Sequence, residues 1–82
     1  MLKIEIGKTA GLVWKQLAKN GKSSLADLIT KTKTNQEMLN LAIGWLAREN
    51  KIHINQEAKN TYIWLTKEEL SKYNPATDQV KK

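Results

Sequence analysis

Apolar and polar residues follow a helical period from residue 9 to residue 50. In residues 9–20 apolar side chains recur every three or four positions, which predicts a helix that Gly21 can end. Ser24 can cap a second, short helix that ends near Thr32. A third helix is predicted over residues 34–50, from a threonine cap to an asparagine suited to the left-handed conformation. We therefore expect three consecutive helices.

An alternating period at both ends of this helical region predicts β-structure. Residues 2–6 alternate apolar and charged side chains, which indicates a short first strand, and Gly7 then forms the turn into the first helix. Residues 52–54 and 61–65 are rich in β-forming side chains and predict the two strands of a hairpin. The polar residues 55–60 between them contain no glycine, so we expect a loose loop rather than a tight two-residue turn.

The C-terminal part predicts one more helix and a tail. Thr66 can cap a brief helix through its hydroxyl, with Glu69 in the first turn, and Pro75 prevents the helix from continuing. We expect one domain, residues 1–74, followed by a disordered tail, residues 75–82. A chain of 82 residues is long enough for one small core only. The predicted fold class is α+β: a short strand, a three-helix core, a β-hairpin and a short C-terminal helix.

The third helix carries more apolar residues than one buried face requires. The residues expected in the core are Met38, Leu41, Ala42, Trp45 and Leu46. Of these, Trp45 is expected to be fully buried. Leu39 and Ile43 widen the apolar arc beyond the part that a three-helix core normally covers, so they are candidates for contact with another molecule.

The second predicted strand of the hairpin also has two apolar faces. If one face enters the core, Tyr62 and Trp64 point away from it, because successive side chains alternate across a strand. These aromatic residues are candidates for a subunit contact. The alternative is that the first strand and the terminal helix cover them.

Charge and composition narrow the range of partners and locations. The net charge of +6 and a pI near 9.7 favour an anionic partner, although thirteen of the fourteen cations are lysines spread along the chain, as on an ordinary soluble surface. Cysteine is absent, which suits a reducing compartment. The N-terminus lacks the apolar core of a signal peptide, and no apolar run approaches the length of a membrane helix. We expect a cytoplasmic protein that does not enter membranes.

Three short motifs are candidates for chemical sites, but none of them predicts catalysis. Gly7-Lys8-Thr9 is similar to the end of a phosphate-binding loop, but the glycine required five positions earlier is Leu2. His53 is the only histidine and has no cysteine to join it in a metal site, so we expect it to face solvent on a strand. Glu68 and Glu69 are adjacent at a helix start and do not form an acid–base pair. The sequence predicts no enzyme, metal, cofactor or small-molecule substrate.

The order of a strand, three helices and a hairpin resembles the winged helix-turn-helix domain over residues 2–73. More narrowly, the segments GKTAGLVWKQL and LAIGWLARENKI resemble an uncharacterised family of short, stand-alone prokaryotic winged-helix proteins. The resemblance implies that residues 34–50 take the place of the recognition helix and residues 55–60 that of the wing.

In winged-helix proteins that bind DNA, the recognition helix enters the major groove and cations of the wing contact the backbone. The resemblance implies that double-stranded DNA is contacted by Gln36, Asn40, Arg48 and Lys59. Glu37 at the front of the helix repels phosphate, and this could be offset by cations or polar groups nearby. The candidates are Lys31 and Lys33 in the turn, and Lys22 or Ser23 before the second helix.

The sequence therefore leaves two alternative functions. The first is a non-enzymatic DNA-binding protein that acts in transcription regulation. The second is a protein-interaction or homodimerisation module on the same fold, without DNA binding. For the second, the candidate contact residues are Leu39, Ile43, Tyr62 and Trp64.

Overall fold

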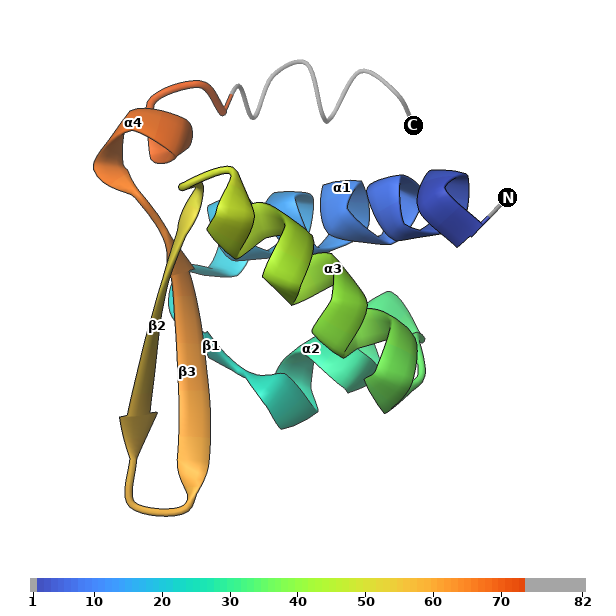
Figure 1. Ribbon diagram of the computed structural model, residues 1–82. Coiled ribbons are helices and arrows are strands. Elements are labelled where there is room, and N and C mark those ends of the chain that lie inside the picture. Colours follow the sequence, from blue (N-terminus) through green and yellow to red (C-terminus); the bar gives the residue numbers. More distant parts are fainter. Residues whose placement is uncertain (1, 74–82) are drawn as a thin grey trace.

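The computed structural model describes residues 2–73, with side chains from residue 4 onward. Its elements in chain order are α1 (Leu2–Asn20), β1 (Ser23–Ser24), α2 (Leu25–Thr32), α3 (Gln36–Arg48), β2 (Ile52–Glu57), β3 (Asn60–Leu65) and α4 (Lys67–Leu70). The three longer helices form one body, and the β2–β3 hairpin runs along its side and extends beyond it (Figure 1). The predicted α+β class is confirmed.

The N-terminal segment differs from its predicted structure. Residues 2–6 are the first turns of α1 and not a strand, and Gly7 lies inside this helix rather than in a turn. The buried face of α1 carries Ala10, Val13 and Leu17, and the half-buried Ile6 continues it toward the N-terminus. A five-residue alternation fits the start of this helical pattern as well as it fits a strand. The first strand is β1, which follows α1 and pairs with β3.

The second and third helices begin at polar caps. Ser24 caps α2 by accepting a hydrogen bond from the Asp27 amide at 3.1 Å, as its position predicts. In α3 the cap is Asn35, whose side-chain oxygen accepts from the Met38 amide at 2.7 Å, and not Thr34. The C-terminal prediction is confirmed in part: Asn50 has a φ of 60°, while α3 already ends at Arg48.

The buried side of α3 is rotated from the predicted one. The core residues of α3 are Leu39, Ala42, Ile43 and Leu46. Leu41 and Trp45 are 42% and 37% exposed, so the prediction that Trp45 is fully buried is wrong. Leu39 is completely buried and Ile43 is 8% exposed, so neither is available to another molecule. The apolar arc of α3 is wider than the core, and packing against α1 selected its Leu39 side.

The hairpin is confirmed, but its tip is tighter than expected. The sheet order is β1-β3-β2, and β2 pairs antiparallel with β3 from Ile52↔Leu65 to Glu57↔Asn60. Only Ala58 and Lys59 connect the two strands, in a turn where Ala58 takes a φ of 54°. The prediction of a loose loop is therefore wrong. A tight turn forms without glycine because Ala58 adopts the left-handed conformation that usually favours glycine. 

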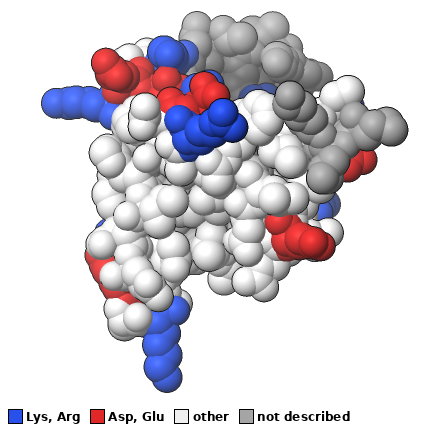
Figure 2. All heavy atoms as spheres, in the orientation of Figure 1, with Lys and Arg blue, Asp and Glu red and all other residues white. Residues whose placement is uncertain are grey.

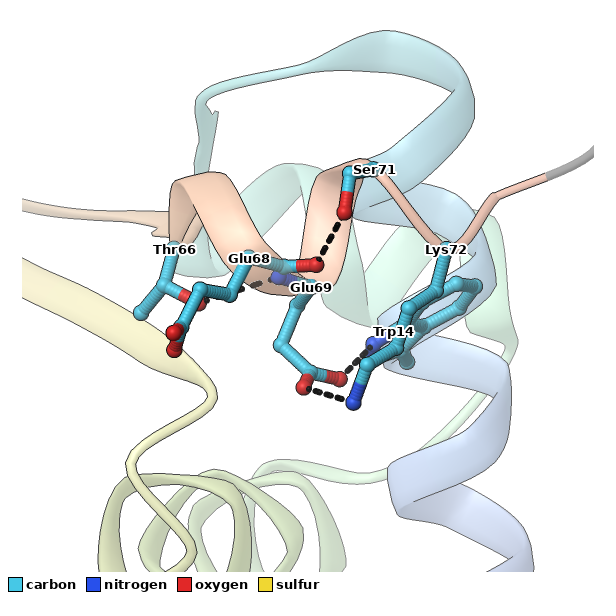
Figure 3. A network of polar contacts seen from close by, with 6 residues as sticks. All are labelled: Trp14, Thr66, Glu68, Glu69, Ser71 and Lys72. Carbon is cyan, nitrogen blue, oxygen red and sulfur yellow. Dashed lines mark hydrogen bonds and ion pairs between the residues drawn. The ribbon is translucent and has the colours of Figure 1, made fainter.

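A polar network attaches the last helix to α1. Thr66 caps α4 by accepting from the Glu69 amide at 3.3 Å, as predicted. The Glu69 carboxylate accepts hydrogen bonds from Trp14 Nε1 at 2.9 Å and from Lys72 Nζ at 2.8 Å (Figure 3). Tyr73 meets the Trp14 ring edge-on at 6.2 Å between ring centroids. The predicted disordered tail lies outside the described residues.

The hydrogen bonds of Glu69 are expected to stabilise the fold to a degree that depends on pH. Hydrogen bonds from Lys72 and Trp14 hold the pKa of the Glu69 carboxyl below its ordinary value of 4.5. The charged form is favoured in the folded state, so this stability is present above that value and is lost as the pH falls through the lowered pKa. Wild type should therefore lose more stability than Glu69→Gln in urea unfolding between about pH 6 and pH 3. Glu68→Gln, on the exposed side of α4, is the control, and parallel curves for wild type and Glu69→Gln would contradict the assignment.

Candidate nucleic-acid interface

The connection between α2 and α3 brings four of the predicted DNA-contacting residues into one short region. They are Lys31, Lys33, Gln36 and Asn40, and all four are exposed. The connection itself is held by backbone hydrogen bonds, because the amides of Lys33 and Thr34 both donate to the Ile29 carbonyl. Lys33 takes a left-handed φ of 55°, which ends α2 and turns the chain into α3. Two cations thus precede the N-terminus of α3, whose helix dipole also favours a negative charge.

The other two predicted contact residues lie away from this region. Arg48 is the last residue of α3, twelve residues after Gln36, so the two are separated by about 18 Å along the helix axis. Lys59 is exposed at the tip of the hairpin, which projects beyond the helices at the end of the molecule opposite α4 (Figure 1). The six residues therefore form an extended set. An elongated polyanion could contact several of them at once, whereas a small ligand could not.

The exposed side of α3 has a polar edge and an apolar edge. Its exposed residues are Gln36, Glu37, Asn40, Leu41, Gly44, Trp45 and Arg48. At about 100° per residue, the amides of Gln36 and Asn40 lie on one edge, while Leu41 and Trp45 lie on the other. In Figure 2 the broad face that includes α3 is formed largely by uncharged residues, and charged atoms lie toward its margins. The cations therefore flank α3 rather than cover it.

Lys22 makes contacts that the sequence did not predict. Its ammonium group pairs with Glu57 at 3.3 Å and lies 5.1 Å and 5.3 Å from the ring centroids of Tyr62 and Trp64. The His53 ring is 5.5 Å from the Trp64 ring, and His53 is exposed, as expected. Tyr62 and Trp64 are half-buried, and Lys22 lies over both rings.

Lys22 and Ser23 are poor candidates for phosphate contact. The charge of Lys22 is already opposed by Glu57. Ser23 is 7% exposed and donates its hydroxyl hydrogen to the Gly21 carbonyl, so the expectation that it could contact DNA is wrong. No sequence signal could have shown the Lys22 contacts, because Lys22 and Glu57 are 35 residues apart.

A groove of about 320 Å³ lies where α1, α3 and α4 meet. It is lined on α1 by Gly7, Ala10, Gly11 and Trp14, and elsewhere by Trp45, Leu46, Lys51, Glu69 and Lys72. The Glu69 carboxylate in this groove already accepts from two partners of the chain itself. Among residues 2–73, no three histidine, cysteine or acidic side chains are grouped so that they could hold a metal ion. None of the helices in this range is both long and apolar enough to span a membrane.

Three helices, with α2 and α3 joined by a short turn, and a β-hairpin beside them define a winged helix-turn-helix domain. Residues 1–65 match the family model described as winged helix-turn-helix domain (DUF2582), and the chain belongs to this family. The chain is also similar to the uncharacterized protein MJ1608 of Methanocaldococcus jannaschii, with 38% identity over 64 residues, which is 74% of this chain and 90% of that protein. The resemblance predicted from the sequence is confirmed.

Proposed function

We propose that this winged-helix protein binds double-stranded DNA, without catalysis, and acts as a small regulator in transcription. The observation that carries the proposal is the position of the exposed Lys31 and Lys33 directly before the exposed amides of α3. Membership of a winged helix-turn-helix family supports the same partner. A cytoplasmic location is part of the proposal.

Each proposed contact follows from the chemistry of its side chain. Gln36 and Asn40 can each form two hydrogen bonds with an adenine edge in the major groove. Lys31 and Lys33 would contact phosphates at the start of α3, and Lys59 would contact the backbone beside the wing. Arg48 would contact a phosphate beyond the other end of α3.

Lys33→Ala should weaken the binding of a random-sequence duplex about three- to tenfold at about 50 mM salt, because one phosphate contact is lost. The loss should be similar for all sequences, since a phosphate contact carries no sequence information. Fluorescence anisotropy of a labelled duplex measures it. The control is Lys67→Ala, which removes an exposed lysine from α4, at the opposite end of the molecule from the hairpin tip (Figure 1). Equal losses in the two variants would contradict the proposed contact.

A protein-interaction module remains the second candidate function. It is favoured by the exposure of Leu41 and Trp45 on the helix that would otherwise read DNA. Glu37, also exposed on α3, disfavours a phosphate partner there as well. Duplex binding by the wild type at about 50 mM salt, a condition that favours phosphate contacts, distinguishes the two functions. A protein-interaction module should show no such binding.

A further inference from the structure

One row of residues on the exposed side of α3 is complementary to the same row on a second, antiparallel copy of the helix. The row consists of Glu37, Leu41, Gly44 and Arg48, which are separated by four, three and four positions. At about 100° per residue these four residues lie within an arc of about 60°. All four are exposed, and among the described residues neither Glu37 nor Arg48 forms an ion pair within its own chain.

The complementarity becomes evident when two copies of α3 are placed antiparallel. Along the helix axis, the midpoint of the row is level with the bond between Ala42 and Ile43. Glu37 and Arg48 are equally distant from this level, and so are Leu41 and Gly44. A twofold axis through this midpoint brings Glu37 of each copy to Arg48 of the other. It also brings Leu41 of each copy over Gly44 of the other.

We propose that α3 pairs antiparallel with α3 of a second copy of this chain through this row. A twofold contact requires a surface that complements itself, and this row supplies opposite charges at its ends and a large residue opposite a glycine at its centre. The alternating spacing of four and three residues suits two helices that cross at about 20°. Another protein would have to match this pattern independently, whereas a second copy matches it by symmetry.

The surroundings of the row favour a close approach. Space is open beside Gly44, where no other group lies within 4 Å of the position of a Cβ atom. Leu41 is 42% exposed and the flanking Trp45 37%, so both have apolar area left to bury. The chain carries a net charge of +6, which makes two copies repel each other on average. The face in Figure 2 has few charges at its centre, so the copies can meet there at a low electrostatic cost.

The proposed contact is small, since it is formed mainly by one pair of 13-residue helices. We therefore expect a weak, reversible dimer with a dissociation constant in roughly the micromolar range. The dimer covers much of the side of α3 that the proposed DNA contact requires. If that function holds, self-association and DNA binding exclude each other, but the dimer itself does not depend on it.

The test is sedimentation velocity of the purified full chain without DNA, at about 50 mM salt and up to several hundred micromolar protein. Wild type should sediment increasingly as a dimer as its concentration rises. Glu37→Arg and Arg48→Glu should each weaken the dimer about tenfold or more, because both ion pairs of the twofold contact become repulsive. Circular dichroism confirms that each variant keeps its helices, as expected for substitutions at exposed positions.

An equimolar mixture of the two variants gives the sharpest result. In the mixed dimer every charge again faces an opposite one, so dimers should reappear although neither variant forms them alone. A strictly monomeric wild type, or a mixture that stays monomeric, would overturn the proposal. So would a dimer that withstands both charge reversals but is lost in Trp64→Ser, because that dimer would use the hairpin instead of α3.

Discussion

Leu39→Ala should lower the free energy of unfolding by about 2–5 kcal/mol, which is a large part of the stability of a domain this small. Leu39 is completely buried in the core shared by α1, α2, α3 and the sheet. The substitution removes apolar contacts and leaves a cavity that the surrounding helices can fill only in part. Urea unfolding followed by circular dichroism measures the change.

Leu41→Ala is the matched control, because it makes the same chemical change two residues away on the same helix. Leu41 is 42% exposed, so its truncation should cost less than about 1 kcal/mol. Unfolding should be measured at a protein concentration below the proposed dimerisation range, so that only the monomers are compared. A cost for Leu41→Ala equal to or above that for Leu39→Ala would show that α3 is rotated from the orientation described.

The affinity for a random duplex should fall about 150-fold between about 50 mM and 200 mM salt if Lys31, Lys33, Arg48 and Lys59 each contact one phosphate. This corresponds to a slope near −3.6 in a plot of log affinity against log salt, because each neutralised phosphate contributes about −0.9. The variant in which all three lysines are replaced by alanine should lose most of this slope together with most of its affinity. Anisotropy titrations at several salt concentrations measure both quantities.

Net charge alone could also produce part of the salt dependence. Lys67→Ala lowers the net charge on α4, at the opposite end of the molecule from the hairpin tip, and should keep most of the wild-type slope. An unchanged slope in the triple variant would exclude these lysines as the phosphate contacts.

The sequence by itself determined the elements whose signals are local. The bounds of α2 follow from the Ser24 cap and from the break in apolar period after Thr32, and both are confirmed. The start of α4 follows from Thr66, whose hydroxyl accepts from an amide within the same turn. The hairpin follows from two β-forming segments close together in the chain. In each case the deciding interaction joins residues that are near in sequence, so the pattern contains it.

Other features were decided only by tertiary structure, because several arrangements satisfied the local pattern equally. The apolar arc of α3 is wider than the core beneath it, so packing against α1 had to select Leu39 and Ile43 and leave Leu41 and Trp45 exposed. Residues 2–6 alternate in a way that suits a strand or a helix, and the buried face of α1 favoured the helix. The contacts of Lys22 and Glu69 join residues 35 and 55 positions apart, and no local period records them. The same packing left the row of α3 in solvent, where it can meet a second copy.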